Sequence, residues 1–418
     1  MEPSQVGLLL AKIETTYGTD PTPTAAANII AVARGLVAPD APSESIDRDI
    51  LDGGFGRVIG INARPHWNFK FRVELRGNRT DGVAADVSAG SASNKVEIDP
   101  LLQACDLAPA YTAESSGGAR DGHVIYNPTV PVNEGSSLTI YFYSQGKLYK
   151  ATGCKGNIEN IVLEAGKFGF LDFSFMGRYN APSDSSIPGS QTWLTTKPPT
   201  LEMPQTHVAA VVTVDSTTDT ITHTGHALLN GDRVRFAAAV IPGGLTAGVW
   251  YFVRDKATNT YKVAATLGGA AINITSNGTT VTVDSAPALV YDDWPGAVFS
   301  TMNLRLGNST VMREDGNSTD GVIGFVNAGR DSKGDFDPES IKEVTHPLWA
   351  DWKSAKAKTL LAQIGNLTGN RITLTAKTKI EKLVYSDRNG RRIQTAQFGV
   401  RNAALGETPG SELALRFH

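Results

Sequence analysis

The chain has 418 residues, with 39 Lys and Arg against 42 Asp and Glu and a formal net charge of −3. Hydrophobic residues make up 41% and charged residues 19%, which excludes a disordered chain. At roughly 100–200 residues per domain, this length suffices for about two to four domains. The near-neutral charge argues against a dedicated nucleic-acid binder. No segment approaches the roughly 20 apolar residues of a membrane span.

Two features bear on the cellular compartment. The two cysteines, Cys105 and Cys154, are too few for a disulfide-stapled scaffold and fit a reducing compartment. Glu2 stands where a secretory signal needs positive charge, and the apolar run that follows it is short. We therefore expect no secretion by that route.

Short alternating runs of Thr, Val and aromatic residues, broken by Gly, Asn and Asp, predict a mainly β fold. In chain order the clearest strands are His66–Leu75, Ser137–Tyr143, Lys167–Gly177, Phe299–Leu306, Arg371–Lys377 and Ile393–Arg401. In the third run, Leu171, Phe173 and Phe175 share one face. Phe168 and Phe170 share the other. Apolar residues on both faces predict a strand buried on one side and packed against a partner on the other.

Two segments have helical patterns. Asp99–Leu107 has Asp99 as a candidate N-cap and Pro100 in the first turn. Pro347–Ile364 carries a stripe of apolar residues at helical spacing and ends at Gly365. We predict one helix in each segment.

Two breaks in composition divide the chain. Tyr179–Pro204 is rich in proline, and Ser285–Gly296 is a second hinge-like stretch. Between them, Gln205–Asp284 alternates short strands with turns of Asn, Asp and Gly, as β-hairpins require. We predict a small all-β domain at 205–284, inserted between a first β domain with an N-terminal arm (1–204) and a second (285–418) that completes the host fold.

The two host parts have a similar order of elements. The first has Phe71–Asn78, a helix, Gly156–Leu163 and the phenylalanine-rich strand. The second has Met302–Asn308, a helix, Asn370–Lys377 and a closing strand. Strand, helix, strand, strand thus occurs twice. This order favours a tandem duplication, and a single elaborated domain is the alternative.

Sequence motifs for catalysis are absent. The sequence lacks G-x-S-x-G, P-loop and H-E-x-x-H patterns. His223 and His226 are close, but no Cys or carboxylate stands at ligand spacing, so we interpret them as turn residues. Glu314–Gly321 lacks the glycine and glutamate of a calcium loop, and Gly53–Gly60 lacks dinucleotide-loop spacing. We expect no enzyme activity, no metal and no cofactor.

Positive charge is concentrated near the C-terminus. Lys353–Arg401 holds 11 Lys and Arg but only two acids, Glu381 and Asp387, a local charge of +9. Such a run can bind phosphates or can dock on an acidic face of a neighbouring subunit. The basic residues of this run are not interleaved with aromatic residues in a way that indicates base stacking. We therefore favour the subunit interface. Its predicted residues are Lys377, Lys379, Lys382, Arg391 and Arg392.

A glycine-rich segment, Asp49–Ala63, is unusually apolar for a free loop. Burial on assembly would explain this composition. The predicted contact residues are Ile50, Leu51, Phe55, Arg57, Val58 and Ile59.

Three segments carry a family resemblance. Lys12–Val32, Gly153–Tyr179 and Asn308–Glu339 resemble the major tail tube proteins of long-tailed bacteriophages. The insert resembles modules of several phage tail proteins, whose H-x-L-x-N-G-D pattern is His226, Leu228, Asn230, Gly231 and Asp232 in this sequence.

The resemblance implies a tail-tube-type β-sandwich or barrel with a flanking helix, here duplicated in tandem. Such protomers form rings that stack into a tube conducting DNA. Tandem domains would give a homotrimeric, pseudo-hexameric ring, and one elaborated domain would give a hexamer. The N-terminal arm and the Asp49–Ala63 loop would reach the next ring. Implied partners are the tape measure protein and phage DNA in the lumen, and tail completion and distal tail proteins, with no membrane. The implied location is the virion tail, with assembly in the host cytoplasm.

A binding protein of the tail surface or baseplate is the alternative. In it, the insert would recognise host glycans through stacking by Trp250, Tyr251 and Tyr261. Aromatic residues in so small a domain also serve to fill its core.

Overall fold

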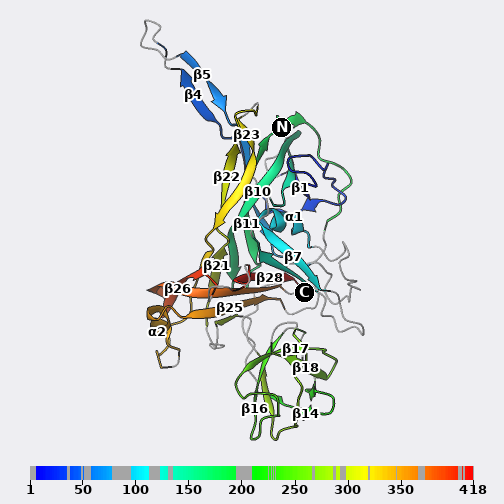
Figure 1. Cartoon of the computed structure of the whole chain (residues 1–418), viewed down its shortest axis with the longest axis vertical. Helices are drawn as coiled ribbons and strands as arrows, with labels where there is room; N and C mark the ends of the chain where they lie inside the picture. The colour runs from blue at the N-terminus through cyan, green and yellow to red at the C-terminus, as the bar shows by residue number, and fades with distance from the viewer. Residues whose placement is uncertain are drawn as a thin grey trace.

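The computed structural model describes residues 6–34, 38–48, 50, 58–77, 96–112, 123–129, 135–193, 210–224, 226, 228, 230, 232–265, 269–285, 289–291, 298–318, 321–344, 346–365, 372–402, 407 and 410–417. These residues form large antiparallel sheets and two short helices (Figure 1). The prediction of a mainly β fold is confirmed. Neither helix of the described segments is long and apolar enough to cross a bilayer.

The elements fall into three stretches of the chain. The first contains β1 (Gly7–Ile13), β2 (Ile29–Ile30), β3 (Ala38–Asp40), β4 (Glu44–Arg48), β5 (Val58–Ala63), β6 (His66–Glu74), α1 (Asp99–Ala104), β7 (Leu107–Thr112), β8 (His123–Pro128), β9 (Leu138–Ser144), β10 (Lys147–Glu164), β11 (Phe170–Tyr179) and β12 (Ser183–Asp184). The second contains β13 (Ala210–Val211), β14 (Thr213–Asp215), β15 (Thr220–Thr222), β16 (Arg233–Ala237), β17 (Trp250–Arg254), β18 (Thr260–Ala264) and β19 (Thr282–Ser285). The third contains β20 (Leu289–Tyr291), β21 (Thr301–Arg305), β22 (Asn308–Glu314), β23 (Val322–Arg330), β24 (Lys333–Phe336), α2 (Leu348–Lys353), β25 (Ala357–Ile364), β26 (Ile372–Arg388), β27 (Arg391–Val400) and β28 (Leu413–Phe417).

The first stretch closes into a barrel. Strands β6, β11, β10, β9 and β1 pair in that order, all antiparallel. β2 lies beside β1, and a bridge between Val32 and Val73 joins the segment after β2 to β6. Along β11 the alternate residues Leu171, Phe173 and Phe175 are buried in the interior. Barrel closure removes free strand edges, which otherwise invite aggregation.

The opposite face of β11 is partly open in the single chain. Phe168, just before the strand, is 44% exposed, and Phe170 is half-buried beneath the guanidinium of Arg72 at 5.2 Å. Arg72 also forms an ion pair with Asp172 on this face. In the single chain, β11 is therefore buried on one side and carries a polar and partly apolar surface on the other.

The same order of strand pairing occurs twice. In the first stretch it is β3–β6–β11–β10–β9, and in the third it is β21–β24–β27–β26–β25. In each, the first two strands continue into a separate two-stranded sheet, β4–β5 or β22–β23, which is the far end of the same hairpin. A short helix follows, and then a long hairpin, β10–β11 or β26–β27.

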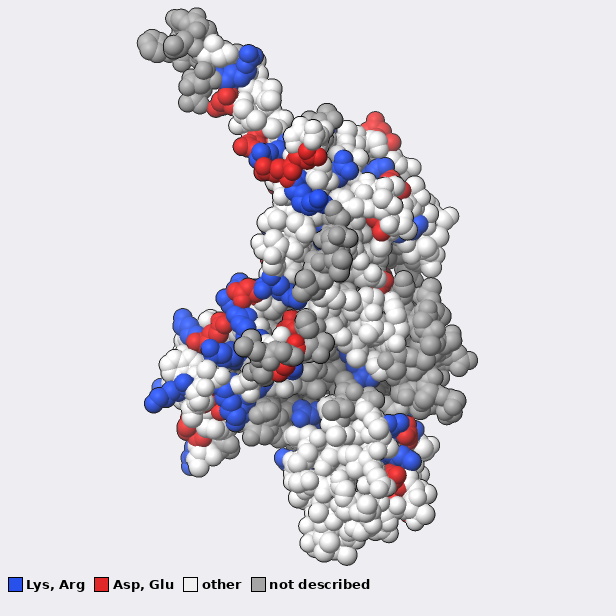
Figure 2. Space-filling view, viewed as in Figure 1, with Lys and Arg blue, Asp and Glu red and all other residues white. Residues whose placement is uncertain are grey.

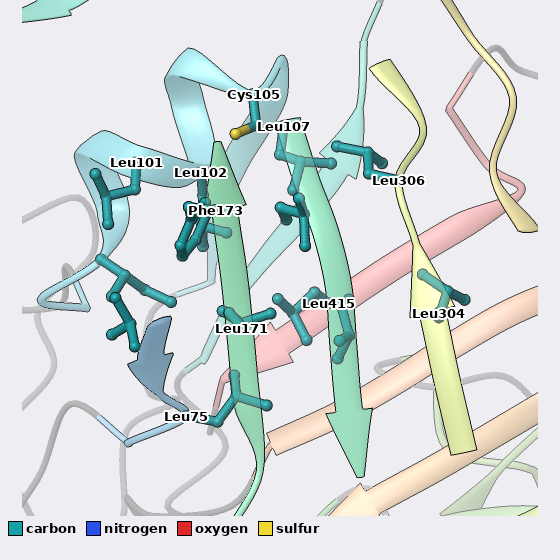
Figure 3. Close-up of a cluster of buried hydrophobic side chains, with 14 of the residues drawn as sticks. Leu75, Leu101, Leu102, Cys105, Leu107, Leu171, Phe173, Leu304, Leu306 and Leu415 are labelled. Carbon is teal, nitrogen blue, oxygen red and sulfur yellow. The ribbon is translucent and has the colours of Figure 1, made fainter. Parts of the chain in front are cut away.

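The two halves share one hydrophobic core. β21 pairs with the C-terminal end of β10, so the sheets are continuous. Figure 3 shows Leu304 and Leu306 from the third stretch near β10 and β11, with Leu101 of α1 beyond those strands. All belong to one cluster of buried residues that runs from the N-terminal strand to Phe417. The halves consequently pack as one body rather than as two separate cores.

The second stretch, residues 210–285, forms its own seven-stranded sheet in the order β13–β19–β16–β17–β18–β15–β14. Its buried residues make a cluster distinct from the main core. In Figure 1 it lies at the opposite end of the long axis from β4–β5.

The second predicted helix is wrong over most of its length. α2 ends at Lys353, and Ala355 has a positive φ of 54° that turns the chain. The rest of the segment is β25, paired with β26 along eight residues. Leu360, Ala362 and Ile364 are buried in it. They also stand two residues apart, the strand period, and pairing with β26 favours the strand.

The other corrections are local. α1 is shorter than predicted, and Ile98 occupies the N-cap position instead of Asp99. The Asp99 carboxylate accepts a hydrogen bond from Tyr126 Oη at 2.7 Å, so it serves tertiary packing. The segment that resembles an N-terminal arm, Lys12–Val32, is not free: Ala25 and Ile29 are buried, and Ile30 belongs to the main hydrophobic core.

Candidate functional site

The β4–β5 hairpin projects from the body of the molecule (Figure 1). Ile46 pairs opposite Ile61, so the two side chains lie on one face, and no third strand pairs with this sheet among the described residues. Exposed fractions are 46% for Ile46, 51% for Ile50, 89% for Ile59 and 63% for Ile61. We call this hairpin the isoleucine arm.

The base of the arm is held by charge. Arg64, at the end of β5, forms 3.1 Å ion pairs with Glu44 of β4 and Glu314 of β22. Gly60 allows the strands to approach, because a Cβ there would lie 2.2 Å from the Ile46 carbonyl oxygen.

Of the predicted contact residues, the structure places Ile50 and Ile59 at the surface of this arm. Val58 begins β5, and nothing is described of its side chain. Leu51, Phe55 and Arg57 lie outside the described residues.

The β22–β23 hairpin is anchored on the barrel. Phe325 is fully buried, and its backbone N–H donates to Tyr17 Oη at 2.6 Å. Tyr17 Oη in turn donates to the Gly153 carbonyl at 2.9 Å. The turn of the β22–β23 hairpin begins at Asp315, whose carboxylate accepts a hydrogen bond from the Asn317 N–H at 2.9 Å. A turn bonded in this way accounts for the acidic run that resembles a calcium loop.

The predicted basic face is divided. Lys377 forms an ion pair with Glu407, and Lys379 is exposed nearby. At the far end of the same hairpin, Arg391 pairs across from Arg388. Lys379 and Arg388 are nine positions apart on β26, a distance of roughly 30 Å at the rise of an extended strand. The predicted basic residues therefore extend along the β26–β27 hairpin, with Lys377 and Lys379 at one end and Arg391 and Arg392 at the other.

Acidic side chains accompany the basic ones throughout this region. Glu339 pairs with Arg388 and Arg391, and Arg401 pairs with Asp331 and Glu381. Figure 2 shows Lys and Arg mixed with Asp and Glu over this part of the surface. Lys382 is exposed between the two ends, and Arg392 is exposed beside Arg391 at the far end. Mixed charge suits a protein interface better than a phosphate-binding track.

An exposed aromatic cluster lies beside these charges, and no sequence pattern indicated it. Trp349 and Trp352 of α2 are in edge-to-face contact at 5.8 Å. The ring centroids of Trp349 and Tyr385 of β26 are 5.6 Å apart. Arg392 lies over the Tyr385 ring, with its Cζ 5.0 Å from the ring centroid. Trp352 and Tyr385 are both exposed. Trp, Tyr and Arg are the residue types that dominate protein-binding hot spots.

A shallow groove of about 430 Å³ crosses the outer face of β10, β21, β24 and β27. It is lined by Arg305 and Lys333 together with Glu159, Asp335 and Glu381. Burial raises the pKa of Asp335, and the charge of Asp337 raises it further. The side chains that line the groove therefore carry both signs of charge.

The predicted aromatic surface of the insert is largely wrong. Tyr251 and Tyr261 are buried in the core of residues 210–285 and alternate there with Val253 and Val263. This period-2 pattern of aromatic and valine residues is the signal that marks them as core. Trp250 is half-buried, with the guanidinium of Arg235 4.9 Å from its ring.

His223 and His226 lie with ring centroids 5.6 Å apart, and both pack on Tyr261. Burial lowers the pKa of both, which favours their neutral forms. Across the described ranges, no group of three or more His, Cys, Asp and Glu side chains is placed to hold a metal ion.

Neither a protein-family model nor a curated protein sequence matches this chain.

Proposed function

We propose that this protein is a structural subunit of a bacteriophage tail tube, which polymerises as stacked rings around a lumen that conducts DNA. The isoleucine arm is the observation that carries this proposal. An isolated two-stranded hairpin is marginally stable in water, and this one exposes isoleucines on both strands. A partner that covers the arm would bury Ile46, Ile59 and Ile61 and pair its free strand edges.

The contact of the arm is proposed to be with the next ring of the stack. The arm lies at one end of the long axis of the molecule and is inclined to that axis, pointing away from the main body (Figure 1). A contact at its far end therefore joins molecules along that axis rather than side by side.

The lateral contact within a ring is proposed to involve the aromatic cluster of Trp349, Trp352 and Tyr385. Its neighbours Lys382 and Arg392 would face carboxylates of the next subunit. Exposed Trp and Tyr rings supply large buried area on association, and the surrounding charges fix the register.

The repeated strand order supports a tandem duplication and a ring of three chains. The orders β3–β6–β11–β10–β9 and β21–β24–β27–β26–β25 give each chain two similar units. Three such chains would present six units around the lumen. A hexamer of single elaborated domains is the competing arrangement. The implied lumen contents are the tape measure protein and phage DNA, and the tube ends would bind tail completion and distal tail proteins.

Negative-stain electron microscopy of the concentrated protein tests the proposal. We expect hollow tubes or stacked rings, with end-on views that average to three-fold symmetry. Six-fold averaging without a three-fold component would contradict the duplicated protomer. The proposal fails if the protein remains monomeric with an initiating tail complex present.

Point substitutions test the arm more sharply than its removal. Ile59→Ser and Ile61→Ser are expected to shorten or abolish tubes, as is deletion of Asp49–Ala63. The matched control is Val211→Ser, at a 76% exposed position of the insert, which should leave tube length unchanged. Tubes of wild-type length from the arm variants would remove the main support for the proposal.

A further inference from the structure

A buried polar cluster links the barrel to the β22–β23 hairpin. Lys155 of β10 is 0% exposed, and Asp106 and Asn327 are also buried. Lys155 Nζ donates to Asp106 Oδ1 at 2.6 Å, and Asn327 Nδ2 donates to Asp106 Oδ2 at 2.6 Å. One carboxylate thus bridges an amine and a carboxamide that are 172 residues apart, at positions 155 and 327. None of the functions considered above uses this cluster.

Two neighbouring hydrogen bonds and one backbone conformation bear on the chemistry of this cluster. Thr310 Oγ1 donates to Asn327 Oδ1 at 2.7 Å, which polarises the amide carbonyl. The Ser136 carbonyl accepts from Lys155 Nζ at 2.9 Å and holds the amine in place. Asp106 has a positive φ of 58°, a conformation that few residues other than Gly, Asn and Asp adopt, and it is kept there by the surrounding contacts. An amine nucleophile, a shared acid–base group, an amide carbon and an oxyanion donor are therefore in one water-poor place.

We propose that Lys155 and Asn327 join as an intramolecular amide cross-link, with Asp106 as the catalytic acid–base group and Thr310 as the oxyanion donor. The reaction joins the Lys155 Nζ to the Asn327 Cγ and releases ammonia. It needs no oxidant, reductant or second substrate.

The proton and bond changes balance within the cluster. A proton moves from Lys155 Nζ to Asp106, which leaves both groups uncharged in a site where charge is costly. The free amine attacks Asn327 Cγ, and the resulting oxyanion is held by the Thr310 hydroxyl. Asp106 then gives its proton to Nδ2 and accepts the second proton of Nζ. The Cγ–Nδ2 bond breaks and ammonia leaves.

The product would tie β10 to β23 covalently. Non-covalent anchoring of this hairpin depends on hydrogen bonds that break when the barrel opens. An amide bond persists through such openings. The cross-link would suit a protein under mechanical load. Its test is independent of the tail-tube proposal, so either proposal can fail without the other.

Mass spectrometry of the denatured full-length chain tests the inference. We expect an intact mass lower than the sequence mass by one ammonia, and a branched tryptic peptide that joins Lys155 to Asn327. The position of the ammonia loss in the chain is the deciding result, because formation of a succinimide at Asn389–Gly390 would also release ammonia. The full sequence mass after prolonged incubation of the folded protein, or loss of ammonia elsewhere only, would overturn the inference.

Three variants separate chemistry from folding. Lys155→Arg keeps the positive charge but removes the nucleophilic amine, so the full mass should return. Thr310→Val keeps the side-chain shape but removes the oxyanion donor, and cross-linking should slow by about tenfold or more. Thr378→Val removes a different strand hydroxyl, one that donates to the Lys358 carbonyl, and should leave the rate unchanged. Equal rates in the Thr310 and Thr378 variants would exclude the oxyanion role.

Discussion

The β4–β5 and β22–β23 hairpins occupy corresponding places in the two halves and have opposite surroundings. Each is the far end of a hairpin whose lower strands pair within the main sheet, β3 with β6 and β21 with β24. The second hairpin packs on the barrel through Phe325 and Asn327. The first leaves Ile46, Ile59 and Ile61 in solvent.

The difference lies in where the apolar side chains point. In β23, Val322 and Phe325 are buried beneath the hairpin, so their removal costs folding energy in the single chain. In the isoleucine arm, the side chains of Ile46, Ile59 and Ile61 are exposed, so their burial can contribute only to binding. The β22–β23 hairpin thus stabilises the fold of the single chain, whereas the corresponding β4–β5 hairpin, as we propose, serves assembly. Free energies of unfolding of the unassembled chain measure this contrast.

Phe325→Ala is expected to give the largest effect. Its ring is fully buried, and truncation leaves a cavity where the hairpin meets the barrel. Phe-to-Ala changes in cores typically cost about 3–5 kcal/mol. Urea or thermal unfolding of the monomer measures the loss. Val311→Ala, at an exposed position of the same hairpin, is the control and should change stability by only about 0.5 kcal/mol. Equal effects would mean that the hairpin is not anchored through Phe325.

Tyr17→Phe should have an intermediate effect. The change removes the hydroxyl that accepts from the Phe325 N–H and donates to the Gly153 carbonyl. An unsatisfied buried donor costs about 1–3 kcal/mol. A variant as stable as the wild type would show that water replaces the hydroxyl.

The same residue predicts a pH dependence. Burial raises the pKa of Tyr17 from 10.0 to about 12, so the folded state favours the neutral phenol. This contribution to stability is fully present below pH 10 and is lost as the pH rises towards 12. Over that window the wild type should lose roughly 1–3 kcal/mol more than Tyr17→Phe. Parallel pH curves for the two proteins would contradict the assignment.

Sequence patterns predicted the structural features that depend on residues near each other in the chain. They missed the features that depend on contacts between residues far apart in the chain. Alternation along β11 identified Leu171, Phe173 and Phe175 as one face, because the strand period of two is a local property. Leu360 and Ile364 satisfied both the helical and the strand period, and only the pairing of β25 with β26 decides between them.

The site residues follow the same rule. Trp349 and Tyr385 meet across 36 residues, and Asn327 reaches Asp106 across 221. Neither pair leaves a local pattern. The arm was predictable as an apolar, glycine-rich segment because its composition is anomalous where it stands. The division of the basic residues between two ends of the β26–β27 hairpin depends on strand length, which the charge count does not contain.

Arg64→Ala examines the charged link between the two hairpins. Arg64 contacts Glu44 at the base of the arm and Glu314 in β22, and all three side chains are well exposed. Exposed ion pairs contribute about 0–1 kcal/mol and are screened by salt. We expect a small loss of stability that disappears at high salt. A loss that persists at high salt would mean that the Arg64 stem supports packing.

Ile59→Ser should have the smallest effect on the free energy of unfolding, although it alters the most exposed isoleucine of the arm. Exposed substitutions away from special features change stability by about 0.5 kcal/mol or less. Measured on the monomer before assembly, the variant should have the same free energy of unfolding as the wild type. A loss above about 1 kcal/mol would place the arm within the cooperative fold, because apolar burial contributes in proportion to area removed from water. In that case the contrast between the hairpins would disappear. A neutral result in the monomer combined with shortened tubes would assign the apolar area of Ile59 to the contact between molecules.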